Sequence, residues 1–167
     1  MIQVYTGNGK GKTTAALGLA LRAAGAGLNI YICQFLKGRY YCELASLKKF
    51  KNIKIKQFGR SCFIRRSPTK RDKELAREGL KSAQEAVANK AYGMIILDEI
   101  NIALHLKLLE QKEIIDLIKK TPKKTELILT GRHASGAILK LADLVSEIKE
   151  YKHYYRKGIK ARKGIEF

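Results

Sequence analysis

Nine residues near the start of the chain have the types and spacing of a phosphate-binding loop. They read Thr6-Gly7-Asn8-Gly9-Lys10-Gly11-Lys12-Thr13-Thr14 and lie between a short alternating segment and a run rich in Ala and Leu. Glycines let successive backbone N–H groups point at one phosphate, and the start of a helix adds its dipole. Lys12 would reach phosphate oxygens, and the Thr13 hydroxyl would ligate Mg²⁺ or Mn²⁺. These nine residues are therefore the predicted ATP-binding residues.

The loop departs from the usual pattern in one detail. The position that carries the first glycine of that pattern is Thr6, and counted from Gly7 the loop is one residue short. The alternative is a glycine-rich turn without a ligand. The strand–loop–helix context favours a nucleotide, but the shorter loop means that the usual placement of the phosphates is not assumed.

Two other polar groups follow apolar segments. Residues 94–101 read MIILDEIN, in which Asp98 would hold the cation directly or through water, and Glu99 would do the same or activate a water. Thr130-Gly131-Arg132-His133 follows ELILT, and Arg132 is a phosphate candidate, with an ordinary surface arginine as the alternative. All three groups stand at the carboxyl ends of predicted strands, where open α/β sheets bind ligands.

Other chemistry has little support. His105 is predicted to be a packing residue, and His133 and His153 are open candidates for ligand contact. The sequence has no Cys/His metal spacing, no GxSxG elbow and no nucleophile beside an obvious base. The predicted site is built around a triphosphate and a divalent cation.

The segments that position these groups alternate between strand and helix patterns. Strands are predicted around residues 2–5, 28–35, 53–58, 94–97, 126–130 and 144–151, and helices at 13–24, 67–88, 111–120 and 134–141. This alternation predicts an α/β, three-layer P-loop NTPase (RecA-like) fold with a mostly parallel central sheet. At 167 residues the chain suits a single domain spanning 1–167.

Composition narrows the setting. No apolar run is long enough for a membrane-spanning helix, and the N-terminus lacks a secretory signal pattern. Three cysteines without CxxC spacing argue against disulfides or zinc and favour a cytoplasmic location. The net charge is +19, and residues 37–90 carry 16 basic and 5 acidic side chains. A surface for a polyanion and a generally basic proteome both account for this excess.

The chain resembles the P-loop corrinoid adenosyltransferases over nearly its whole length. The motifs that carry the resemblance are TGNGKGKTTAALGLALRAAG (6–25), QFLKG (34–38), ILDEINIAL (96–104), LTGRHA (129–134), LADLVSEI (141–148) and KGIKARKGIEF (157–167). The resemblance implies transfer of the 5′-deoxyadenosyl group of ATP to Co(I) of a corrinoid, with release of triphosphate. It also implies that ATP lies reversed in the loop, that Lys12 and Arg132 stabilise the leaving group, and that the enzyme is a homodimer.

The resemblance also implies a corrinoid site. In the family, aromatic residues after the third strand displace the lower cobalt ligand; Phe63 matches one of them, while Arg65 stands where many members have tryptophan. Phe63, Arg65 and Asn101 are therefore the expected corrinoid residues, and Cys62 is expected to pack. Family members often carry an N-terminal extension over the site, and here that cover is expected to be absent or supplied otherwise. A flavodoxin-type reductant is a possible partner for the basic segment.

Other functions compete with this one. A nucleic-acid-dependent RecA-like ATPase is the main alternative, favoured by the net charge, although few aromatic residues are placed for base stacking and nucleic acid is not the expected partner. A small-molecule kinase would release ADP instead of triphosphate. A non-catalytic ATP-binding switch would release neither.

Overall fold

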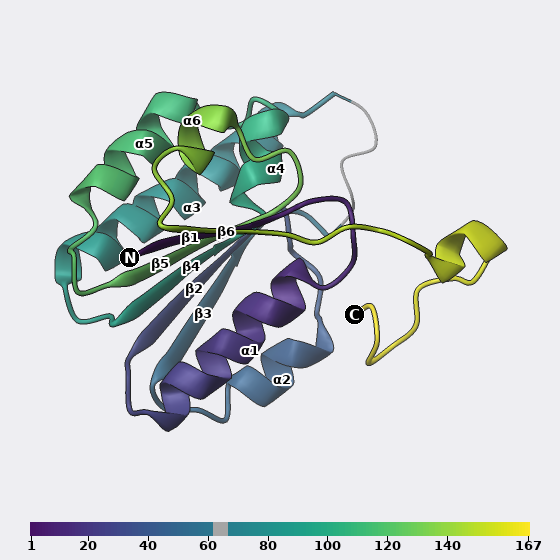
Figure 1. The fold of residues 1–167 in the computed structure, drawn as a ribbon, viewed down its shortest axis with the longest axis horizontal. Coiled ribbons are helices and arrows are strands. Elements are labelled where there is room, and N and C mark those ends of the chain that lie inside the picture. The colour runs from purple at the N-terminus through teal and green to yellow at the C-terminus, as the bar shows by residue number, and fades with distance from the viewer. Residues whose placement is uncertain (62–66) are drawn as a thin grey trace.

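A six-stranded, all-parallel sheet forms the centre of the molecule. The computed structural model describes residues 1–61 and 67–167. The strands lie in the order β3-β2-β4-β5-β1-β6 (Figure 1). Their bounds are β1 Ile2–Thr6, β2 Ile30–Phe35, β3 Ile53–Phe58, β4 Met94–Asp98, β5 Glu126–Thr130 and β6 Leu144–Glu147. Parallel pairing places all the carboxyl ends at one edge, so the polar groups that follow β1, β4 and β5 meet there.

Helices cover both faces of this sheet. They are α1 Lys12–Gly25, α2 Cys42–Leu47, α3 Lys70–Asn89, α4 Ile100–His105, α5 Gln111–Lys120 and α6 Gly136–Leu139, followed by a 3₁₀ turn, η1, at Tyr154–Lys157. Figure 1 shows α1 and α2 on one face and α3 to α6 on the other. The structure thus confirms the predicted α/β fold with three layers, which is consistent with a P-loop NTPase-like fold.

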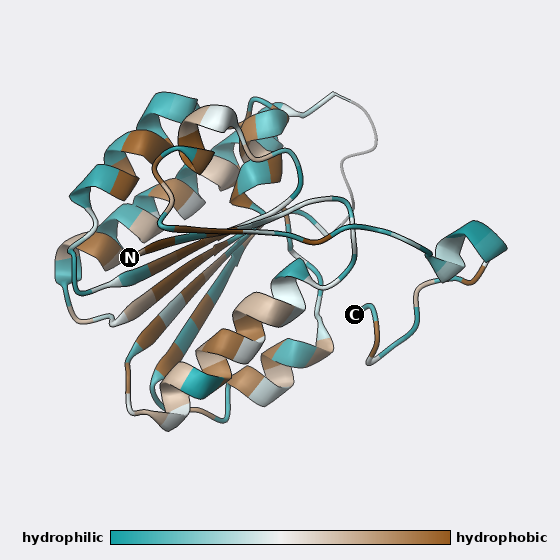
Figure 2. Ribbon diagram, viewed as in Figure 1, coloured by the Kyte–Doolittle hydropathy of each residue, from teal (hydrophilic) through white to brown (hydrophobic). Residues whose placement is uncertain are grey.

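The central strands are apolar on both faces because each face meets helices. In β2, Ile30 and Ile32 join the core under α1 and α2, whereas Tyr31, Cys33 and Phe35 join the core under α3. Every residue of β2 and β4 is buried, which explains why these segments read as continuous apolar runs (Figure 2). Within the described part of the chain, no helix combines the length and apolarity that crossing a membrane requires.

The element boundaries differ from the prediction in specific places. Helix α3 begins at Lys70 because Thr69 and Asp72 form a capping box just before it. The helix predicted at 134–141 is a single turn, and the strand predicted at 144–151 ends at Glu147. The short elements α2 and η1 were not predicted, since segments this short carry too few turns to show a periodicity.

Candidate active site

The phosphate loop folds around its own lysine. Lys12 is buried, and its Nζ donates to the carbonyl oxygens of Gly7 and Gly9 at 2.7 and 2.6 Å. Burial lowers the pKa of Lys12, while the nearby charge of Glu99 opposes that shift. No carboxylate within 1–61 and 67–167 forms an ion pair with Lys12. A ligand with several anionic oxygens would offer this ammonium group stronger partners than two neutral carbonyls.

Two glycines of the loop allow close contact with the chain that leaves β6. The Gly9 N–H donates to the Ile148 carbonyl at 2.7 Å, and the Ile148 N–H donates to the Thr6 carbonyl at 2.9 Å. A Cβ atom on Gly7 or Gly9 would lie 2.5 or 2.8 Å from the carbonyl oxygen of Ile148. The N–H of Gly9 is therefore already used, and the donors open to a phosphate include the first N–H groups of α1.

Asp98 is the hub of the site. Its Oδ1 accepts hydrogen bonds from the hydroxyls of Thr13 and Thr130 at 2.8 and 2.7 Å. Its Oδ2 accepts from Gln34 Nε2 at 3.2 Å and pairs with Lys37 Nζ at 2.8 Å. These four partners come from the start of α1, the end of β2 with the turn after it, and the end of β5, and they enclose Asp98, which is fully buried.

Burial and the charges around Asp98 shift the pKa values of Asp98, Lys37 and Glu99 in different directions. Burial alone would raise the pKa of Asp98, but the Lys37 charge and the hydrogen bonds hold it below its ordinary value. Burial opposes charge on Lys37 as well, yet Asp98 and Glu43 raise its pKa. The pKa of Glu99 is raised, first by burial and then by repulsion from Asp98. The Asp98–Lys37 pair is thus ionised. A bound cation would stabilise the charged form of the Glu99 carboxyl group.

The residues present fit a Mg²⁺ ion that is shared with a nucleotide. Thr13 and Glu99 supply oxygen donors, the kind that Mg²⁺ prefers. The Glu99 carboxylate has no hydrogen bond or ion pair with any described residue, whereas both oxygens of Asp98 are occupied twice. No cluster of three His, Cys, Asp or Glu side chains suited to a metal occurs in the described ranges, so phosphate oxygens would have to complete the coordination.

The turn after β5 places Arg132 beside the phosphate loop. Gly131 has φ +124°, and a Cβ there would lie 3.1 Å from Asn101 Cβ. Asn101 donates to the Gly131 carbonyl at 3.2 Å. His133 also has a left-handed backbone, with φ +61°, and its ring stacks on His105 with centroids 4.1 Å apart. His105 was predicted to be a packing residue; it is exposed at the end of α4, and the packing that it makes is with the His133 ring.

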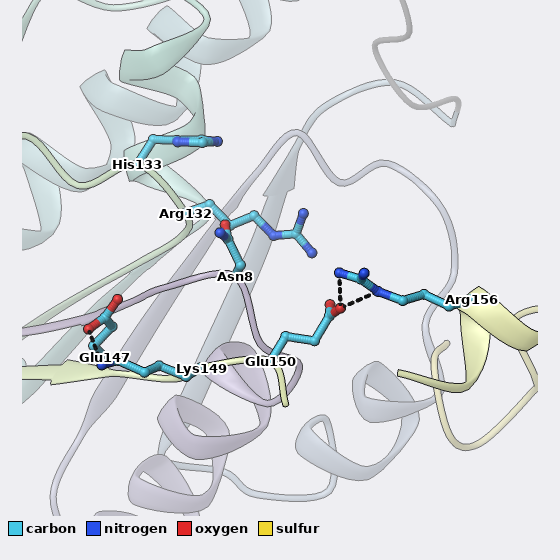
Figure 3. Close-up of a pocket in the computed structure, with 7 residues that line it drawn as sticks. All are labelled: Asn8, Arg132, His133, Glu147, Lys149, Glu150 and Arg156. Atoms are coloured by element: carbon cyan, nitrogen blue, oxygen red, sulfur yellow. Dashed lines mark hydrogen bonds and ion pairs between the residues drawn. The ribbon is translucent and has the colours of Figure 1, made fainter. Parts of the chain in front are cut away.

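A polar cavity of about 480 Å³ opens between this turn and the C-terminal segment (Figure 3). Its lining comes from the phosphate loop, the turn after β5 and the chain beyond β6. The lining residues are Asn8, Arg132, His133, Glu147, Lys149, Glu150 and Arg156. Arg132 is exposed here and, like Lys12, makes no ion pair with a described residue. The predicted phosphate candidate therefore faces a cavity that adjoins the loop.

The remaining predicted residues fall in different places. Thr14 is exposed on α1, and Lys10 Nζ is held by Tyr154 and Glu166 of the C-terminal segment. His153 lies outside the cavity, where its Nδ1 accepts from the N–H of Tyr155 at 3.1 Å.

The residues expected around a corrinoid fall into two groups. Phe63, Arg65 and Cys62 lie outside the described residues. Asn101 is fully buried, so in this structure it offers no surface to a bulky corrinoid and instead supports the Gly131 turn. Its Oδ1 is the one buried side-chain polar atom of the described ranges without a hydrogen-bond partner.

Gln34, Lys37 and Thr130 occur within the sequence motifs quoted above but were given no role there, whereas in the structure all three hold Asp98 in place. Gln34 was detectable as a lone polar residue within an apolar strand, because a fully buried amide must find a partner. Lys37 is two residues beyond β2 and gave no such signal. Its pairing depends on β2 and β4 being neighbours.

Comparisons with known proteins match this architecture. The family model described as ATP:corrinoid adenosyltransferase BtuR/CobO/CobP matches residues 1–167. A corrinoid adenosyltransferase of Pseudomonas aeruginosa is 34% identical over 169 residues, covering all of this chain and 83% of that protein. One from Escherichia coli K12 is 33% identical over 167 residues, covering all of this chain and 85% of that protein.

A protein of Nostoc that carries no assigned function is 36% identical over 180 residues. The match takes in 99% of this chain but only 48% of the Nostoc protein, so this chain spans about half the length of that relative. The nucleic-acid-dependent ATPase alternative finds no support among these relatives. The phosphate loop, the buried Asp98 and the full-length matches together show that the chain belongs to the ATP:corrinoid adenosyltransferase family.

Proposed function

We propose that this site transfers the 5′-deoxyadenosyl group of ATP to the Co(I) centre of a corrinoid and releases triphosphate, in the synthesis or salvage of an adenosylated corrinoid. The observation that carries the proposal is the pairing of a phosphate loop with Asp98 through Thr13, in a chain that matches this family from end to end. The reduced cobalt is part of the substrate and is itself the nucleophile. Its electron pair forms the Co–C bond while the C5′–O bond breaks, the triphosphate leaves with the bonding pair, and cobalt becomes Co(III).

The protein residues have two tasks in this reaction. They must align the ribose C5′ with the cobalt and stabilise charge on the departing triphosphate. Lys12, Arg132 and the first N–H groups of α1 are suited to the second task, because each is a donor without an anionic partner in the free protein. Thr13 and Glu99 would hold Mg²⁺, which would neutralise phosphate charge. Asp98 would act by orienting the Thr13 hydroxyl.

Several narrower statements remain predictions of the resemblance. They are contact of Phe63 and Arg65 with the corrinoid, reversal of ATP in the loop, a homodimer, a flavodoxin-type reductant and a cytoplasmic location. Binding of ATP by residues 6–14 is supported by the loop geometry, with Lys10 and Gly9 engaged elsewhere in the free protein.

The test is anaerobic incubation of the pure protein with ATP, Mg²⁺ and chemically reduced cob(I)alamin. We expect a light-sensitive adenosylcobalamin spectrum together with one triphosphate per alkylated cobalt. Chelation of divalent cations should suppress the reaction, and added Mg²⁺ should restore it. ADP and phosphate in place of triphosphate, with no alkylated cobalt, would refute the proposal. In a Glu99→Gln variant we expect a higher Mg²⁺ requirement, since a neutral amide is a weaker ligand.

A further inference from the structure

The C-terminal segment, residues 148–167, returns to the phosphate loop after leaving the sheet. Figure 1 shows it running from β6 out past α1 before the chain ends. Its ending includes the KGIKARKGIEF motif, for which the site described above has no use. One set of contacts joins this segment to the phosphate loop, and a second set, within the segment, lies at the cavity that Arg132 also lines.

The first set of contacts joins the end of the chain to Lys10. The Nζ of Lys10 donates to Tyr154 Oη at 2.7 Å and to Glu166 Oε1 at 2.6 Å. Tyr154 also donates to Glu166, and Arg162 donates its backbone N–H to the same carboxylate at 2.7 Å. The segment is thereby tethered to the phosphate loop at a point 156 residues away in sequence.

The second set of contacts is an ion pair between two residues of the segment that line the cavity. Arg156 Nε donates to Glu150 Oε1 at 2.8 Å, and Arg156 Nη2 lies 2.7 Å from the same oxygen. The Glu150 side chain is 17% exposed and that of Arg156 is 78% exposed. In Figure 3 the guanidinium groups of Arg132 and Arg156 both reach toward the Glu150 carboxylate, with Asn8 of the phosphate loop beside them.

Two cations of the cavity are paired with carboxylates that also line it. Glu150 pairs with Arg156, and Glu147 pairs with Lys149 at 3.7 Å. A triphosphate carries more negative charge than one carboxylate and can accept bidentate hydrogen bonds from a guanidinium. An exposed arginine that is held by a single carboxylate can exchange it for a phosphate at little cost, because exposed ion pairs are weak.

We propose that the C-terminal segment completes the triphosphate site, with Arg156 as a further triphosphate-binding residue that Glu150 holds ready in the free protein. The inference rests on the proposed function and adds a residue to that site. On binding, Arg156 leaves Glu150 and pairs with the triphosphate from the side opposite the phosphate loop, while the Lys10–Glu166 tether keeps the segment in place.

The test compares Arg156→Gln with Lys163→Gln, which removes the same charge from an exposed position of the same segment outside the cavity. Binding of inorganic triphosphate with Mg²⁺ is measured by calorimetry, without a corrinoid. We expect Arg156→Gln to weaken binding about tenfold and to raise KM for ATP by a similar factor, as for loss of a charged hydrogen bond. Lys163→Gln should change both by less than about twofold.

A second pair of variants tests the exchange. Glu150→Gln frees Arg156 and should tighten triphosphate binding about threefold, whereas the same change in an Arg156→Gln background should have a smaller effect. Equal losses from Arg156→Gln and Lys163→Gln, no loss from Arg156→Gln, or an equal effect of Glu150→Gln in both backgrounds would overturn the inference. A wild-type protein that binds triphosphate but transfers no adenosyl group would instead refute the proposed function.

Discussion

Asp98 and Glu166 are both carboxylates that gather partners from distant parts of the chain, but they lie in opposite surroundings. Asp98 is fully buried among Thr13, Thr130, Gln34 and Lys37. Glu166 lies at the surface, and its partners Lys10 and Arg162 are 38% and 50% exposed. The hydrogen bonds that Glu166 accepts from Lys10, Tyr154 and Arg162 lower its pKa, as Lys37 lowers that of Asp98.

The difference shows why similar contacts can serve different purposes. Water can compete for Lys10 and Arg162, the exposed partners of Glu166, and screen their charges, so the C-terminal segment can be held and released at little cost. Asp98 has no water to replace a lost partner, so its network is rigid. The rigid network around Asp98 suits residues that must orient a metal ligand. The weaker contacts of Glu166 suit a segment that must accommodate a substrate and release a product.

The largest effect is expected when Lys37, the buried cation that pairs with Asp98, is removed. Lys37→Met leaves the Asp98 carboxylate buried without its counter-charge, and we expect a loss of about 3–5 kcal/mol in the free energy of unfolding. Urea denaturation measures it. Lys54→Met, at an exposed position of β3, is the control and should change stability by less than about 0.5 kcal/mol. A small loss for Lys37→Met would show that Asp98 is not held as the structure indicates.

Two lysines of the phosphate loop sharpen the comparison in catalysis. Lys12→Met removes a buried cation that forms no ion pair with a described carboxylate, and we expect kcat to fall about 100-fold, as when one preorganised donor is lost. Lys10→Met removes an exposed cation that is shared with the C-terminal segment, and we expect KM for ATP to rise only about threefold. Initial rates with cob(I)alamin distinguish the two variants. Equal losses of activity in Lys12→Met and Lys10→Met would contradict the contrast between buried and exposed groups.

Asp72 offers the smallest and most local case. Burial raises its pKa, but hydrogen bonds from Thr69 and the charge of Arg60 bring it below its ordinary value of 3.8. A lowered pKa means that the stabilisation is present above pH 3.8 and is lost as pH falls through the folded-state pKa. Asp72→Ala should cost about 1 kcal/mol at neutral pH. Thermal unfolding should show the stability difference between Asp72→Ala and the wild type narrowing as the pH falls below 3.8. A stability difference independent of pH would exclude the charged cap as its cause.

The sequence by itself determined the local features of this protein. The glycines and Lys12 predicted a phosphate loop, because a glycine-rich turn between a strand and a helix lets backbone N–H groups point at a phosphate. The apolar runs at 94–97 and 126–130 announced buried strands, and both were confirmed as β4 and β5. The alternation of strands and helices was enough for the fold class, since parallel strands need crossover connections. Corrinoid contacts by Phe63 and Arg65 stay predictions.

Tertiary structure alone decided which of these features meet. Thr13 and Asp98 are 85 residues apart, and they touch because only β5 separates β4 from β1 in the sheet order. Lys37 reaches Asp98 for the same reason, through the pairing of β2 with β4. A hydrophobic period reports that one face of a segment is buried, but it does not say which segment covers that face. Strand order and the return of the C-terminal segment to Lys10 therefore had to be seen in the folded molecule.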